Sequence, residues 1–166
     1  KGPLMHSVLV RGIYPKLRES VQSLRQLVAP VSALDALQQE IEALRKGQEV
    51  PEVPGIILGS GLLSLIDVKV GDVVELVAPT AQKFGELKPF KIVGVYDSGL
   101  KHYDNRLVMM SVPAAQRFFH MGKVVTGLEI GLFEPEKSQE IARRMAEKYS
   151  LSIQEWQSFN RPLFEA

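Results

Sequence analysis

The segment from Pro54 to Asp104 constrains the fold of this chain more than any other part of its sequence. It contains apolar runs rich in β-branched residues at 55–59, 73–78 and 90–96. Such runs, about four to eight residues long and bounded by turn signals, are typical of β-strands. Gly71-Asp72 supplies the turn before the second run, because glycine and aspartate favour the backbone angles of tight turns. The centre of the chain is therefore predicted to be a strand-rich module.

The N-terminal third is predicted to hold one strand followed by two helices. Ser7 to Ile13 is β-branched and apolar enough for a strand. In the next two stretches, 16–28 and 32–46, apolar residues recur at helical spacing, and Gly47 supplies a stop for the second helix. The connector 47–54 holds two prolines and two acidic residues, so we expect a seam between subdomains there.

The last part of the chain shows strand and helix patterns in turn. Leu107 to Val112 reads as a strand, and a helix should follow from Pro113. Thr126 to Phe133 alternates as a strand does, Pro135 to Tyr149 has helical apolar spacing, and Leu151 to Trp156 reads as a strand again. The chain is therefore predicted to end in a β-α-β unit.

Together these elements predict an α+β fold with mixed sheets, short helices and two subdomains. The expected divisions are an N-terminal strand and helical segment at 1–53, the strand-rich module at 54–124 and the β-α-β unit at 125–166. The chain has 166 residues, 45% of them hydrophobic, which is enough to build a core.

Composition excludes several classes of function. There is no cysteine, so disulfides, thiolate zinc sites and cysteine nucleophiles are all excluded. Twenty basic and nineteen acidic residues are spread without long runs, so the chain carries no electrostatic footprint for nucleic acid. The most apolar stretch, Pro54 to Ile66, is shorter than the roughly 18 residues that indicate a membrane span.

The histidines give little support to an enzyme. His6, His102 and His120 lack the spacing that places two imidazoles on one helix face, so no metal site is predicted. In one interpretation His102 is a general base oriented by Asp104. The favoured interpretation is a connecting loop, because the segment joins two predicted strands, contains the residue types of turns and brings no nucleophile.

Gly59-Ser60-Gly61 superficially resembles a serine elbow or a phosphate-binding loop. It lacks the pattern of either motif, since no G-x-S-x-G sequence and no following lysine with serine or threonine is present. We expect a tight strand-to-helix turn in which the glycines adopt backbone angles that other residues resist. The sequence thus predicts no catalytic residue, no cofactor site and no metal site.

Several segments, in their order along the chain, carry a family resemblance. These are GIILG at 55–59, DVKVGDVV at 67–74, IVGVYDSG at 92–99, YD at 103–104 and VTGLEI at 125–130. Each is common alone, but in this order they resemble the periplasmic part of lipoprotein-releasing ABC transporter permeases of the LolC/LolE family. The resemblance runs from about Val10 to the C-terminus. The family's periplasmic region begins with a further segment that nothing here matches, so we expect a truncated N-terminus.

The resemblance implies a function without catalysis in this chain. Such a domain lies between the first and second membrane helices of an inner-membrane permease, on the periplasmic side. The permease transfers lipoprotein cargo from the membrane to a soluble periplasmic lipoprotein carrier. ATP hydrolysis resides in a separate cytoplasmic ATPase subunit, and the permease pairs with a second copy or a paralogue. No cofactor is implied.

The segment from Pro79 to Pro89 lies where one permease of the family projects a hairpin that docks the carrier. We expect a shorter docking loop here, with Phe84 as an aromatic anchor and with Lys83 and Lys88 as basic neighbours. In the alternative interpretation, Phe84 folds back onto the core.

Two other functional classes stay open. The related macrolide-exporter and cell-division permeases have similar extracytoplasmic domains, which would bind an adaptor or another periplasmic partner. An enzyme would instead require a convergent polar cluster around His102 or Asp104 in a pocket.

Overall fold

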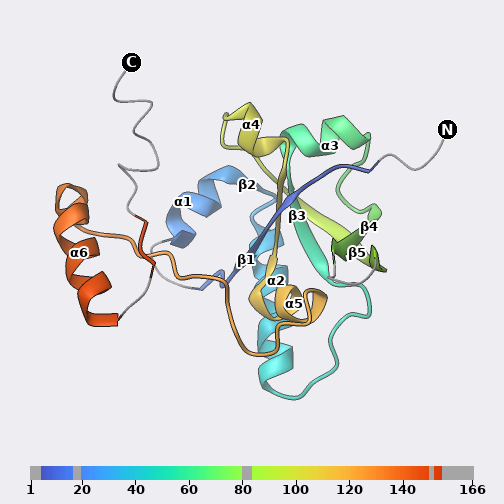
Figure 1. The fold of residues 1–166 in the computed structure, drawn as a ribbon. Coiled ribbons are helices and arrows are strands. Elements are labelled where there is room, and N and C mark those ends of the chain that lie inside the picture. Colours follow the sequence, from blue (N-terminus) through green and yellow to red (C-terminus); the bar gives the residue numbers. More distant parts are fainter. Residues whose placement is uncertain (1–4, 17–19, 80–83, 150–151, 155–166) are drawn as a thin grey trace. The chain divides into compact units, whose positions relative to one another are not determined.

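The computed structural model describes residues 5–16, 20–79, 84–149 and 152–154. The chain divides into two compact units, Lys1–Thr126 and Gly127–Ala166, and Figure 1 shows the elements of each. We describe each unit by itself.

In the described residues, the first unit is built on one mixed sheet. Its strands are β1 (Leu9–Ile13), β2 (Val28–Ala29), β3 (Gly55–Gly59), β4 (Val73–Pro79), β5 (Phe84–Tyr96) and β6 (Leu107–Ser111). The order is β1-β6-β3-β5-β2, and β4 pairs with β5 beside this path. The pairs β1–β6 and β3–β5 are parallel, whereas the other pairs are antiparallel. The predicted α+β class is confirmed.

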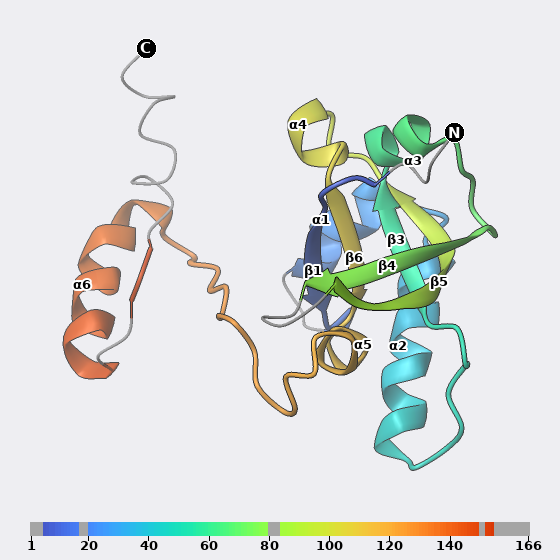
Figure 2. The same ribbon diagram turned by 45° about the vertical axis from the view of Figure 1, so that its right-hand side comes forward.

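The central strands β3 and β6 are buried on both faces, as their continuous apolar sequences require. Because successive side chains point to opposite faces, Ile56 and Leu58 join one core cluster while Ile57 joins the other. The first cluster packs under α5 (Val112–Phe118) and α3 (Ser60–Ile66). The second packs under α2 (Ser32–Arg45). The sheet is therefore a middle layer between helices (Figure 2).

Helix α2 confirms the second predicted helix, and its last turn ends before Gly47, whose φ of +66° suits a glycine stop. No side chain caps its N-terminus. The amide of Ala33 instead donates to the carbonyl of Pro30. Asp35, in the first turn of the helix, pairs with Arg25 at 3.5 Å.

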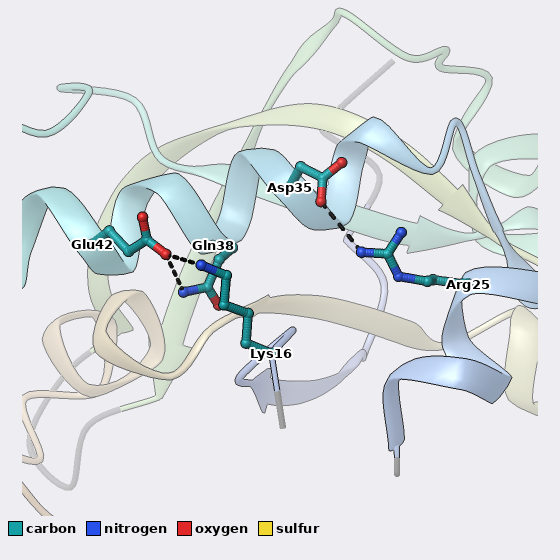
Figure 3. Close-up of polar contacts among 5 residues, drawn as sticks. All are labelled: Lys16, Arg25, Asp35, Gln38 and Glu42. Atoms are coloured by element: carbon teal, nitrogen blue, oxygen red, sulfur yellow. Dashed lines mark hydrogen bonds and ion pairs between the residues drawn. The ribbon is translucent and has the colours of Figure 1, made fainter. Parts of the chain in front are cut away.

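The exposed side of α2 is tied to the N-terminal segments. Figure 3 shows Lys16, which follows β1, and Gln38 both donating to the carboxylate of Glu42. Arg25 of α1 (Ser20–Leu27) reaches Asp35 in the same view. These contacts are largely solvent-exposed, so they orient the N-terminal segments on α2 more than they stabilise the fold.

Two expectations for the first unit need correction. The helix expected at 16–28 ends at Leu27, because Val28 and Ala29 pair with the end of β5 as β2. The expected seam at 47–54 lies inside one compact unit. The reason is that strands from both sides of this connector, β1 and β2 before it and β3 to β6 after it, share one sheet.

In the second unit, the described residues contain the 3₁₀ turn η1 (Pro135–Lys137) and helix α6 (Ser138–Tyr149), which confirms the predicted helix. Within the ranges that the structure describes, the predicted β-α-β unit is not formed. Residues 126–133 and 152–154 adopt no strand, whereas Leu151, Glu155 and Trp156 lie outside the described residues. The alternating segment has no partner strand within the described part of this unit. Across the described ranges, no helix is both long and apolar enough to span a bilayer.

Candidate docking hairpin

The antiparallel hairpin of β4 and β5, residues 73–91, is the candidate functional site, and we call it the docking hairpin. Its register places Val74 opposite Phe90 and Val77 opposite Leu87, and it runs to Pro79 opposite Phe84. The expected loop from Pro79 to Pro89 is therefore wrong, since β5 already begins at Phe84 and only 80–83 connect the two strands.

Glycine and proline misled the sequence interpretation of this loop. A Cβ on Gly85 would lie 2.1 Å from the carbonyl oxygen of Ala78, so glycine is needed for a close strand approach and not for a turn. The register shifts between Val77 and Pro79, as at a β-bulge. Pro89 sits opposite Glu75, in the half of β5 that β3 does not reach, so its missing N–H removes no bond to β3.

Strand β5 has two halves with different neighbours. From Lys91 to Tyr96 it pairs with β3 inside the sheet. From Phe84 to Phe90 its partner among the described strands is β4, so this half forms a two-stranded ribbon with β4. The hairpin is thus a continuation of a central strand.

The inner face of the docking hairpin is anchored in the core. Ala78 and Phe90 are buried in the first core cluster, and Val74 and Leu76 pack against it. The ring of Phe90 meets that of Phe118 on α5 edge to face, with centroids 5.3 Å apart. Such an aromatic pair contributes about 0.5–1.5 kcal/mol beyond its buried area. The ribbon therefore has one defined face turned to solvent.

The outer face of the hairpin carries apolar side chains together with Glu75 and Lys91. Residues directly opposite in an antiparallel pair share a face, so Val77 lies beside Leu87 and Val73 beside Lys91. Val73 is 56% exposed and Leu87 is 55% exposed. Glu75 is exposed on the same strand, two residues from Val73. The sequence could not distinguish this face from the inner one, because β4 has apolar residues on both.

The structure places the three predicted docking residues differently. Lys83 lies outside the described residues. Phe84 begins β5 opposite Pro79. Lys88 lies opposite Leu76, on the core-facing side of the ribbon, and pairs with Glu86 at 2.5 Å. The hydrogen bond from Lys88 and, to a smaller extent, its positive charge hold the pKa of Glu86 below its ordinary value.

The polar group at His102 and Asp104 has a structural role. Asp104 of α4 (Lys101–Asp104) is buried and accepts hydrogen bonds from Ser98, from the hydroxyl at 2.7 Å and from the backbone N–H at 3.1 Å. His102 is exposed. The segment joins β5 to β6, as expected, with a one-turn helix inside it. In the described ranges, no cluster of histidine and acidic residues could hold a metal ion.

The glycines of Gly59-Ser60-Gly61 form the predicted strand-to-helix turn, but for another reason than expected. Gly59 has a φ of −63°, which any residue adopts. A Cβ there would lie 2.0 Å from the carbonyl oxygen of Asp104, and one on Gly61 would lie 1.8 Å from the side-chain oxygen of Asn105. Close contact with the backbone at the end of α4 therefore requires Gly59, whereas a Cβ on Gly61 would mainly meet the movable side chain of Asn105.

Comparison with known proteins adds one relative. No protein-family model matches the chain. The lipoprotein-releasing system transmembrane protein LolC of Neisseria meningitidis serogroup B (strain ATCC BAA-335 / MC58) is 28% identical over 145 residues, which cover 77% of this chain and 35% of LolC. The chain thus spans about a third of the length of the curated relative it matches. By this similarity, the chain is related to the LolC/LolE family of lipoprotein-releasing ABC transporter permeases.

Proposed function

We propose that the chain is the periplasmic domain of an inner-membrane ABC permease that releases lipoproteins to a soluble periplasmic carrier. The similarity to a transmembrane protein of a lipoprotein-releasing system supports this function. The role of the chain is recognition and mechanical coupling, while a separate cytoplasmic ATPase subunit hydrolyses ATP. The full permease works with a second copy or a paralogue, and lipoproteins are its cargo.

The exposed apolar side chains on the outer face of the docking hairpin are the observation that carries this proposal. Val73, Val77 and Leu87 lie on one face of a ribbon whose other face is packed on the core. A carrier of acylated proteins must present an apolar surface where it takes up its cargo, and an exposed apolar strand face suits such a partner. Because β4 and β5 are paired and packed on the core, the docking face is preformed, which lowers the entropic cost of docking. Lys83, Phe84 and Lys88, the residues that the sequence predicts to dock the carrier, stay part of this proposal.

Titration calorimetry of the 166-residue chain with the purified carrier tests the proposal. Leu87→Ser should weaken binding about tenfold or more, a loss of about 1.4 kcal/mol, because it removes a large apolar contact from the outer face. Phe84→Ala tests the tip in the same way.

Leu100→Ser is the matched control, since Leu100 is similarly exposed but precedes α4, outside the hairpin. It should bind like the wild type. If circular dichroism shows that the wild-type chain is folded and it still does not bind the carrier, the proposal is contradicted. Binding to an adaptor of an exporter instead would assign the chain to the related exporter permeases.

A further inference from the structure

Strand β1 forms one edge of the sheet in the first unit (Figure 2). It pairs with β6 along its whole length in a continuous register, and no described strand lies on its other side. The amide of Leu9 donates to the carbonyl of Arg106, just before β6. Because the N–H and C=O groups of successive residues point to opposite sides of a strand, those of Val10 and Gly12 point away from β6. They meet no hydrogen-bond partner among the described residues.

This edge of β1 is open to solvent. Gly12 is exposed, and the side chain of Leu9 is 51% exposed. Val10 is half-buried because its side chain packs against the first core cluster, not because the edge is covered. An open strand edge is a template for pairing with another strand, so proteins usually blunt such edges with short strands, charges, prolines or bulges.

The other open strand edges in the described residues are blunted in these ways. Strand β2 has two residues and is followed directly by Pro30. Strand β4 carries the exposed Glu75, a register shift and a terminal Pro79. The half of β5 that β3 does not reach contains Pro89. In contrast, β1 has five residues in unbroken register, with no proline and with Arg11 as its one charge.

We propose that β1 is a self-association edge, at which the β1 strands of two copies of this chain pair antiparallel around a two-fold axis. Backbone groups that point out of a sheet are satisfied by an added strand, and not by an apolar helix face or a lipid chain. A second copy brings a strand with the same open edge, so one two-fold contact satisfies both copies. The proposal is independent of the proposed carrier docking.

Charge selects the register of this pairing. Outward groups must meet outward groups, so the two-fold axis passes through a residue of β1. An axis at Arg11 would set two like charges opposite each other, which destabilises a strand pair. An axis at Gly12 would set Arg11 opposite Ile13, whose side chain is already buried in its own copy. An axis at Val10 sets Arg11 opposite the exposed Leu9, and we assign this register.

The assigned register explains how Leu9 is covered. Val10 of each copy meets Val10 of the other in a hydrogen-bonded pair, so Leu9 and Arg11 form non-hydrogen-bonded pairs, in which side chains come closest. The alkyl stem of Arg11 then lies along Leu9 while its charged end stays in water. Such an interface is small, and interfaces of this size are weak. We therefore expect a dissociation constant between about 10 and 1,000 µM.

Sedimentation equilibrium of the 166-residue chain, from about 5 µM to about 1 mM, tests self-association. Amide hydrogen exchange followed by NMR over the same range tests where the copies meet. At roughly ten times the dissociation constant, about a fifth of the chains are monomers by mass action. Exchange at Val10 and Gly12 should then be about fivefold slower than in dilute solution. The amide of Arg11 faces β6, so its protection should not depend on concentration.

A charge series at Leu9 tests the register. Relative to Leu9→Gln, Leu9→Lys should weaken the dimer about three- to tenfold and Leu9→Glu should tighten it by a similar factor, because each copy sets this residue opposite Arg11 of the other. About 0.5 M salt should bring the two variants closer together. Leu65→Lys and Leu65→Glu are the matched controls, since Leu65 on α3 is 50% exposed. Both should associate like the wild type.

Val10→Pro tests the backbone pairing itself. It removes an N–H that β6 does not use, so the fold should persist in circular dichroism while the dimer weakens at least about tenfold. If this variant unfolds, the series at Leu9 decides. A chain that stays monomeric to about 1 mM overturns the proposal, as does a dimer that leaves exchange at Val10 and Gly12 unchanged. Shifts of the same sign for Leu9→Lys and Leu9→Glu, or slowing of exchange at Val10 by the carrier alone, also overturn it.

Discussion

Strand β4 and the segment from Thr126 to Phe133 have similar alternating sequences but different structures. In β4 the backbone pairs with β5, and Val74, Leu76 and Ala78 pack on the core. The later segment has no partner strand in the described residues, and Phe133 is 93% exposed. Alternation therefore specifies which side chains share a face, while an available partner strand decides whether a strand forms.

The partner of β4 is close in sequence, which explains much of the difference. The two strands of the docking hairpin are separated only by residues 80–83. In the described part of the second unit, η1 and α6 offer no sheet edge. A local hairpin forms readily because its loop is short and closing it costs little entropy.

The largest expected difference between the docking hairpin and the segment from Thr126 to Phe133 comes from their phenylalanines, one buried and one exposed. Phe90→Ala should lower the free energy of unfolding by about 3–5 kcal/mol, because Phe90 is buried against Phe118 and its removal leaves a cavity. Phe133→Ala should leave it nearly unchanged. Urea unfolding followed by circular dichroism measures both. A large loss for Phe133→Ala would show that the later segment is packed in solution.

Glycine substitutions give a smaller contrast. Gly85→Ala should destabilise the chain by about 1–3 kcal/mol, since the new Cβ would meet the backbone oxygen of Ala78 and the strands must move apart. Gly127→Ala meets nothing within 4 Å and should be neutral or slightly stabilising. Thermal unfolding midpoints of the two variants should therefore move in different directions. Equal losses would argue that residues around Gly127 are paired.

The smallest effect concerns the charges of the hairpin. Lys88→Met should raise the pKa of Glu86 toward its ordinary value, because it removes both a hydrogen bond and a charge. In the wild type, the stability that Glu86 contributes is present above that ordinary value and is lost as pH falls through its lowered pKa. The contribution is small because the pair is exposed. A carboxyl NMR titration measures the shift, and Lys91→Met, on the same strand, should not cause it.

Sequence patterns predicted the elements whose signals are local. Strands β3, β4 and β6 and helices α2, α5 and α6 follow from their apolar spacing and from stops such as Gly47. The two-residue strand β2 was missed, because Val28 continues the helical spacing of α1 and only its pairing with Tyr96 makes it a strand. The first half of β5 was missed because Gly85 and Pro89 resemble loop residues.

The candidate sites were predicted less completely. The sequence placed the docking segment between β4 and β5 but not the outward face of Val73 and Leu87, which depends on which side of the ribbon meets α5. It predicted β1 as a strand but not the open edge of that strand. No spacing rule reports which strands lie beside β1, since the edge arises only when β6 pairs with it on one side.

Strand β5 runs for thirteen residues from the tip of the hairpin to the end of β3. At about 3.3 Å per residue it is roughly 40 Å long. At one end it lies between neighbouring strands, and at the other its partner among the described strands is β4, which packs on the core. A load applied at the tip therefore passes along continuous backbone to the centre of the first unit, and a partner that pulls on the hairpin pulls on the sheet itself.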